Sequence, residues 1–276
     1  MSTPSSIDRQ AFTAFEHTAW ESNVSDYEAA YARVTAQSIE PLLNAVVLRA
    51  GDRLLDVATG PGDIAPAATA RGALFCGVDF SSAMMERARA RQPGVTFEVG
   101  DAEALPFPDA SFDAVVMNFG MLHLAKPERA MVEAARVLKA GRRYAFTVWD
   151  KPEETVGFGL VLNAIRTLGN PDVPLPAGPP FFRFSEASEC ERSLRQSGFV
   201  DIRITRVPQA WRFETPDEPF DAIYNGGVRI KATLRAQTAE ARAAIREAVC
   251  EGARGFLRNG MIELPMPAVL ASAAKA

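Results

Sequence analysis

The chain has 276 residues, a formal net charge of −4 at pH 7, and 47% hydrophobic residues. This length accommodates one catalytic domain with an insertion, and the apolar content is sufficient for a buried core. Acidic and basic residues are interspersed along the chain. That pattern argues against a nucleic-acid surface, which normally carries a basic patch or stripe.

The three cysteines, Cys76, Cys190 and Cys250, show neither metal-ligand spacing nor a paired framework. We therefore expect no metal site and a reducing cytoplasm as the compartment. The N-terminal residues lack the charged and apolar regions of a signal peptide, and the sequence contains no apolar run of about 18 residues. These features predict a cytoplasmic protein without a membrane partner.

The first 50 residues show helical spacing of apolar side chains, for example at Tyr27, Tyr31 and Val34. Short apolar runs then alternate with helical periodicity up to residue 150, which is typical of a parallel sheet with helices on both faces. The predicted strands are Arg53–Val57, Ala73–Val78, Thr96–Val99, Ala114–Asn118 and Tyr144–Val148. The predicted helices are Ile64–Ala70, Ser82–Arg91 and Glu128–Leu138, and a serine is expected to cap the second of them.

The pattern changes after Trp149. Residues 151–184 are rich in proline and glycine and predict an irregular lid segment. A helix ended by Gly198 is expected next, followed by a strand with the sequence VDIRITRV. Residues 216–255 look mainly helical, and the stretch PMPAVLASAAK has the character of a closing strand.

A glycine turn follows the first predicted strand, in the stretch LLDVATGPGDIA. Gly60 and Gly62 permit a tight turn in which a nucleoside-bearing ligand lies against the main chain, near a helix N-terminus. The turn also fits the dinucleotide fingerprint, with Asp79 as the acid about 20 residues further on. Asp56 at the strand tip would face a pyrophosphate unfavourably but suits an ammonium group, which S-adenosylmethionine carries.

Four segments of the sequence are informative together, in their order and spacing: LLDVATGPG, GVDFSSAMMERAR, GDAEALPFPDASFDAVV and EAARVLKAGRRYAFTVWD. Together they resemble the class I S-adenosylmethionine-dependent methyltransferases, in the broad group that includes the quinone-biosynthesis enzymes. The resemblance implies a Rossmann-like, doubly wound α/β fold with a mostly parallel seven-stranded sheet that ends in an antiparallel strand pair. It also implies an N-terminal helical cover (1–50), a cofactor-binding core (51–150), and a lid insertion after strand 5 with the rest of the catalytic domain (151–276).

The resemblance places the methionine part of the cofactor against Asp56 and the backbone of Ala58, Thr59, Gly60 and Gly62. Asp56 would hold the amino group, directly or through water. The alternative is that this carboxylate only caps the turn. The family commonly has glycine where Ala58 stands, and since alanine adds only a methyl group, we expect binding to survive.

The adenosine part would be held by residues that follow the next two strands. Asp79 can accept two hydrogen bonds from a ribose diol, unless it is a simple helix-entry acid. Asp101 and the backbone of Ala102 would meet the edge of adenine, with a turn aspartate as the alternative. Phe80 and Met84 would flank the base, although ordinary core burial explains Met84 almost as well.

Asn118 and Phe119 end the fourth predicted strand, where ligands of open α/β sheets lie. Their backbones are expected near the transferred methyl group, and the side chain of Asn118 has the alternative role of tying the loop. Thr35 and Gln37 are candidates to reach the cofactor tail from the N-terminal cover. An N-cap of the following helix is the favoured alternative for Thr35.

His123 lies near the same mouth of the sheet and is a candidate general base for an acidic acceptor. Its alternative role is to pack or cap the loop. Tyr27, Trp149, Phe181 and Phe182 are candidates to line the acceptor pocket, with core or helix-face packing equally plausible. Such aromatic side chains favour an apolar or aromatic small-molecule acceptor.

The sequence thus predicts an S-adenosylmethionine-dependent methyltransferase that acts on a small molecule by in-line displacement. Two alternatives stay open. One is an S-adenosylmethionine-binding protein that has lost methyl transfer, which the fold alone does not exclude. The other is an NAD-dependent oxidoreductase, which would need its glycine turn near the chain start and no acid at position 56.

Overall fold

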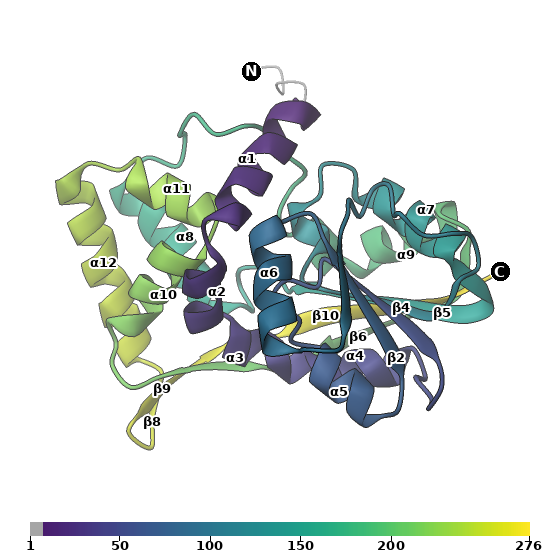
Figure 1. Cartoon of the computed structure of the whole chain (residues 1–276). Coiled ribbons are helices and arrows are strands. Elements are labelled where there is room, and N and C mark those ends of the chain that lie inside the picture. The colour runs from purple at the N-terminus through teal and green to yellow at the C-terminus, as the bar shows by residue number, and fades with distance from the viewer. Residues whose placement is uncertain (1–7) are drawn as a thin grey trace.

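The computed structural model describes residues 8–276, and residues 1–7 of the predicted N-terminal cover lie outside the described part. Its main feature is a seven-stranded sheet with the strand order β3-β2-β1-β4-β5-β10-β6 (Figure 1). The pairs among β1 to β5 are parallel, whereas β10 runs antiparallel to both β5 and β6. The predicted Rossmann-like, mostly parallel sheet with a closing antiparallel pair is confirmed.

The strands of this sheet are β1 Arg53–Val57, β2 Leu74–Asp79, β3 Thr96–Val99, β4 Phe112–Asn118, β5 Leu138–Trp149, β6 Phe199–Val207 and β10 Ala268–Lys275. The prediction for β5 was too short, because its first half is polar. There Arg142 and Lys139 are held by ion pairs to Asp113. Ion pairs to a neighbouring strand thus hold this half of β5, which lacks the apolar residues by which strands are recognised in a sequence.

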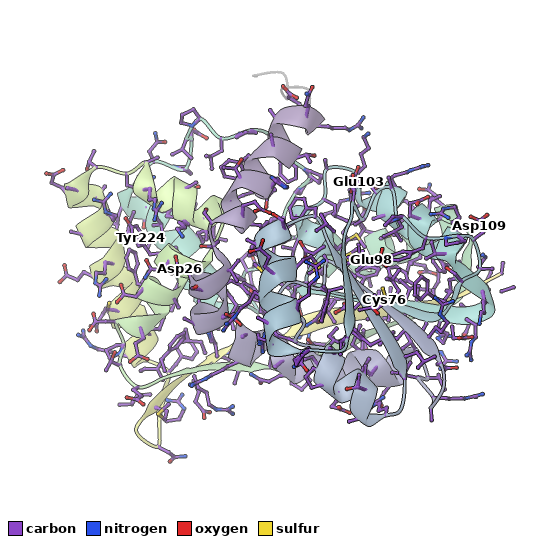
Figure 2. The ribbon with its side chains drawn as sticks, viewed as in Figure 1. Asp26, Cys76, Glu98, Glu103, Asp109 and Tyr224 are labelled. Carbon is purple, nitrogen blue, oxygen red and sulfur yellow. The ribbon has the colours of Figure 1, made fainter. Side chains whose placement is uncertain are left out.

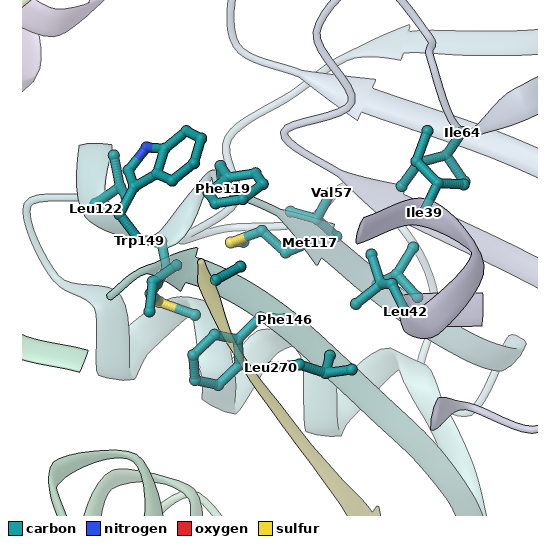
Figure 3. Packing of buried hydrophobic residues seen from close by; sticks show 14 of the residues in the cluster. Ile39, Leu42, Val57, Ile64, Met117, Phe119, Leu122, Phe146, Trp149 and Leu270 are labelled. Atoms are coloured by element: carbon teal, nitrogen blue, oxygen red, sulfur yellow. The ribbon is translucent and has the colours of Figure 1, made fainter. Parts of the chain in front are cut away.

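The helices that cover the sheet are α4 Ile39–Ala45, α5 Ala65–Ala70, α6 Ser82–Arg91, α7 Pro127–Val137 and α9 Ala187–Gln196. Since both faces are covered, the central strands are buried almost throughout, as expected for parallel sheets. Figure 3 shows Leu42 of α4, Met117 of β4 and Phe146 of β5 within one hydrophobic cluster. The hydroxyl of Ser81 accepts a hydrogen bond from the Met84 N–H, which confirms the predicted serine cap of α6.

A helical cap lies beside the carboxyl ends of the strands and is built from both halves of the chain (Figure 1). Its members are α1 Arg9–Glu21, α2 Val24–Ala30, α3 Ala32–Thr35, α8 Val156–Leu168, α10 Glu218–Gly226, α11 Arg229–Arg235 and α12 Ala239–Arg254. Within it α2 packs against α10, and α8 packs against α12. Figure 2 shows Asp26 and Tyr224 on two of these helices, α2 and α10, at some distance from Cys76 on β2.

The lid prediction was wrong for its first half, because α8 occupies residues that were expected to be irregular. Gly157 and Gly159 look like helix breakers in the sequence. Both lie in α8, and each position requires glycine because a neighbour leaves no room for a side chain. A Cβ at Gly157 would lie 3.0 Å from Met266 Sδ, and one at Gly159 would lie 2.5 Å from the Pro152 carbonyl oxygen. These glycines therefore serve close packing.

A second sheet was not predicted. It joins three short strands, β7 Ala210–Phe213, β9 Met261–Pro265 and β8 Leu257–Arg258, in the order β7-β9-β8. Within residues 8–276, no helix has both the length and the hydrophobicity that crossing a membrane requires. The same part of the chain contains no cluster of His, Cys, Asp and Glu side chains suited to a metal ion.

Candidate functional site

A cavity of about 350 Å³ lies between the carboxyl ends of the sheet strands and the helical cap. Its walls come from the ends of β1 to β5 on one side and from α1, α2, α8 and α11 on the other. Ligands of open α/β sheets bind at this edge, and the volume is in the range of small-molecule pockets. The cavity is therefore the candidate site.

The turn after β1 forms one wall and depends on left-handed backbone conformations. Ala58 has a φ of 54° and Gly60 one of 53°. Alanine in this conformation is strained, which explains why related turns have glycine there. Gly120 makes room for the Ala58 methyl, because a Cβ at Gly120 would lie 2.6 Å from the Cβ of Ala58. Nothing lies within 4 Å of a Cβ built at Gly60, so its backbone is open to the cavity.

Asp79 lies at the end of β2, lines the cavity and is buried. Its Oδ2 accepts a hydrogen bond from the Gly60 N–H at 2.9 Å, and its Oδ1 accepts one from the Ser81 N–H at 3.0 Å. Burial raises the pKa of Asp79, while these two N–H donors oppose the shift. Each carboxylate oxygen retains a lone pair for a further donor, such as a ribose hydroxyl.

Asp56 does not line the cavity, so of its two expected modes of contact the one through water fits this geometry. Thr59 and Gly62 do not line the cavity either. The Thr59 hydroxyl donates to Asp56 Oδ2 at 2.5 Å, whereas Oδ1 is buried and has no partner within residues 8–276. Burial raises the pKa of Asp56 to about 8. Gly62 serves packing, since a Cβ there would lie 2.8 Å from the Phe97 ring.

The other residues expected at the adenosine end do line the cavity. They are Phe80, Met84, Asp101 and Ala102. Asp101 is exposed, and its Oδ1 accepts a hydrogen bond from the Glu103 N–H at 2.8 Å, which is the geometry of a turn aspartate. Met84 and Ala102 are buried. The structure thus brings the acids after β2 and β3 to one cavity wall.

Asn118 and Phe119 also line the cavity at the end of β4. The Asn118 Oδ1 accepts hydrogen bonds from Ser38 Oγ at 2.8 Å and Thr147 Oγ1 at 2.5 Å, and its Nδ2 donates to the Thr35 carbonyl at 3.2 Å. This side chain therefore ties the N-terminal cover to β4 and β5. Phe119 stacks on Trp149 with ring centroids 4.1 Å apart.

The structure brings one of the two candidates of the N-terminal cover to the cavity. Thr35 lines it, ends α3 and precedes the 3₁₀ helix Ala36–Ser38; its hydroxyl makes no cap and donates to the Tyr31 carbonyl instead. Gln37 does not line the cavity. Its side chain is exposed and exchanges two hydrogen bonds with the backbone of Ala210 on β7. Because β7 was not recognised in the sequence, this structural role for Gln37 was missed.

His123 lines the cavity and contacts a residue that the sequence reasoning missed. Its Nδ1 lies 2.9 Å from Oε2 of Glu16 on α1, whose side chain is fully buried. Trp20 packs edge-on against the imidazole, with ring centroids 4.9 Å apart. A signal for Glu16 exists, since it lies four residues after Phe12 on the buried face of α1.

The remaining wall is aromatic. Tyr27, Trp149, Phe181 and Phe182 line it as predicted, and Tyr31 and Phe158 add to it. The rings of Phe181 and Phe182 meet edge-on at 4.9 Å. Burial raises the pKa of both tyrosine hydroxyls well above their ordinary value, so both remain neutral near pH 7. This end of the cavity suits an apolar ring.

The fold and the cavity define a Rossmann-like α/β protein that binds its ligand at the carboxyl ends of the strands. Residues 55–146 match the family model of a methyltransferase domain. The chain is 31% identical over 271 residues to an uncharacterized protein of Mycobacterium tuberculosis, covering 95% of this chain and 94% of that protein. It is 39% identical over 127 residues to the demethylmenaquinone methyltransferase of Clavibacter sepedonicus, covering 44% and 52% of the two chains.

A solved structure from Thermotoga maritima, of an S-adenosylmethionine-dependent methyltransferase described as a possible histamine N-methyltransferase, superposes with a TM-score of 0.56. It covers 95% of this chain and all of its own, at 20% identity, so this likeness concerns the fold. The chain therefore belongs to the methyltransferase family that this domain model describes. This assignment replaces the NAD-dependent alternative.

The raised pKa of Asp56 predicts a pH-dependent stability. The pKa of Asp56 in the folded protein is about 8, above the ordinary value of 3.8. The stability that the neutral carboxyl contributes is therefore fully present at a pH below 3.8, and it is lost as the pH rises through 8. Asp56→Asn mimics the neutral form. Between about pH 5 and about pH 8, the free energy of unfolding of the wild type should fall relative to this variant by about 1 to 4 kcal/mol. Parallel profiles in urea titrations without ligand would contradict this expectation.

Proposed function

We propose that the protein transfers a methyl group from S-adenosylmethionine to an apolar or aromatic small molecule in the cytoplasm, without nucleic-acid or membrane partners. In this proposal residues 51–150 bind the cofactor, residues 1–50 cover it, and residues 151–276 supply the acceptor wall. The observation that carries the proposal is the two-ended cavity, with acids at the strand ends on one side and aromatic rings beside His123 on the other.

The residues present fit the cofactor. The Asp79 carboxylate would accept hydrogen bonds from the ribose diol, and Asp101 and Ala102 would meet the adenine edge. The adenine faces would contact Phe80 and Met84. When bound, S-adenosylmethionine supplies an electrophilic methyl group on a sulfonium, which is already a good leaving group.

Asp56 is the candidate partner of the amino group. Its Oδ1 is buried and lacks a donor among residues 8–276, and such an oxygen is costly to leave unpaired. Because Asp56 does not line the cavity, a cationic group there would satisfy this oxygen through a bridging water, and its charge would favour the ionised carboxylate. Thr59 holds the other oxygen in place.

His123 is the candidate general base, and Glu16 is a positioning residue that acts through it. The buried Glu16 carboxylate faces Nδ1 of the imidazole at 2.9 Å, which favours the tautomer with the proton on Nδ1. Nε2 is then the nitrogen that accepts a proton from an acceptor hydroxyl or acidic carbon. The aromatic walls exclude water and align the acceptor, which an in-line displacement requires.

The acceptor class is supported by the wall chemistry and by one relative. Phe181, Phe182, Phe158 and Trp149 offer flat apolar surfaces on which an aromatic ring packs well. The Clavibacter sepedonicus relative is named a demethylmenaquinone methyltransferase. That name supports testing quinol-like acceptors first.

Asp79→Asn tests the cofactor site. The variant keeps the side-chain shape but replaces one acceptor oxygen with a donor, so S-adenosylhomocysteine should bind at least about tenfold more weakly in isothermal titration. Asp109→Asn is the control: Asp109 lies away from the cavity in an exposed ion pair with Arg136, and its variant should bind like the wild type (Figure 2). Wild-type affinity in Asp79→Asn, or binding of NAD without any response to S-adenosylhomocysteine, would refute the proposed site.

The general-base role predicts different kinetic effects for a variant of His123 and a variant of Glu16. His123→Ala should reduce turnover by about 10² at saturating cofactor, measured with the most active acceptor of a panel of quinols and phenols. Glu16→Gln should lower kcat and shift its pH profile, while KM for the cofactor changes little. Full activity in His123→Ala would show that the histidine only packs the loop, and an unshifted pH profile in Glu16→Gln would contradict the positioning role.

A further inference from the structure

Arg229, at the start of α11, is the one lysine or arginine among the described residues that line the cavity. It lines the cavity from the side of the cap, together with Gly227, Ile230 and Thr233. Its Nη1 atom is buried and has no hydrogen-bond partner within residues 8–276. Neither the cofactor-binding role nor the general-base role explains a cation in this place.

Aromatic rings contact the guanidinium of Arg229, and no acidic side chain among residues 8–276 forms an ion pair with it. The group lies over the rings of Phe12 and Phe15 on α1, at 5.4 and 5.7 Å from their centroids. Burial lowers the pKa of Arg229, and Glu16 is the one acid that opposes this shift. Arg229 is partly buried, and withdrawing part of a cation from water without giving it an acceptor is unfavourable.

Glu16 does not act as the counter-ion in a direct pair. One of its oxygens is engaged with His123. The other, Oε1, has no partner in the described part of the chain, although the buried Nη1 atom of Arg229 also lacks one there. A structural ion pair would have joined these two groups. Because it has not formed, the charge of Arg229 remains available to a molecule in the cavity.

We propose that Arg229 binds a carboxylate of the methyl acceptor, so that the substrate class is an aromatic or apolar acid. This inference rests on the proposed methyltransferase function and adds the substrate's charge to it. The guanidinium suits the purpose because it stays ionised and presents several N–H donors to an oxyanion. Glu16 contacts His123 and acts electrostatically on Arg229, so the guanidinium and the candidate base are both close to this carboxylate. One small acceptor would then meet both groups.

The test compares matched acids and amides on the full chain saturated with S-adenosylhomocysteine. The probes are benzoate with benzamide and 2-naphthoate with 2-naphthamide, measured by isothermal titration. At least one acid should bind about tenfold or more tightly than its amide. Arg229→Met should abolish this preference, and Arg229→Lys should restore part of it. Arg235→Gln is the matched control, since Arg235 lies on the same helix over the Tyr224 ring and should keep the full preference.

The outcomes separate the two proposals. If no acid binds more tightly than its amide, or if Arg229→Met keeps the preference, the carboxylate inference is overturned while S-adenosylhomocysteine binding still supports a methyltransferase. If the protein does not bind S-adenosylhomocysteine, the proposed function fails first. Undiminished S-adenosylhomocysteine affinity in Arg229→Met shows that the variant is folded.

Discussion

The Asp79 carboxylate is the contact on which the arrangement of the site depends. It accepts one N–H from the turn after β1, at Gly60, and one from the turn after β2, at Ser81. Two loops from neighbouring parallel strands are thereby fixed to one charged group, at the edge of the sheet where a ligand lies. Burial of that group is unfavourable by itself, and its polar partners offset the cost. The same oxygens that hold the loops are those a ribose would meet.

The cap closes the cavity because both halves of the chain hold it. Trp211 Nε1 donates to the Ala30 carbonyl at 2.9 Å, and Asn23 Nδ2 donates to the Gly226 carbonyl at 2.7 Å. Asn118 links the same cover to the sheet. These ties place α1 against the cavity, so that its buried face contributes a carboxylate to the acceptor end. The cavity therefore has acidic residues on its sheet side, and aromatic rings together with Arg229 on its cap side.

Local patterns in the sequence were sufficient for the core. The bounds of β1, β3 and α6 agree with the prediction. The signals that define these elements, the spacing of apolar residues and the serine cap, lie within a few residues of one another in the sequence. The acids after β2 and β3 were predictable for the same reason. Helix α8 was not predicted, because a glycine needed for close packing, such as Gly157, resembles a helix breaker in the sequence. Glu16 and Arg229 were missed because their roles depend on the assembly of the cap: Glu16 meets His123 across 107 residues of chain.

The central claim is that one cavity binds the nucleoside at the sheet edge and the acceptor beneath the cap. A crystal structure of the full chain with S-adenosylhomocysteine tests it most directly. The account predicts the ribose hydroxyls within hydrogen-bond distance of Asp79, the adenine between Phe80 and Met84, and the sulfur directed toward the aromatic end beside His123. A nucleoside bound elsewhere, or one that leaves Asp79 with its backbone partners alone, would contradict the account.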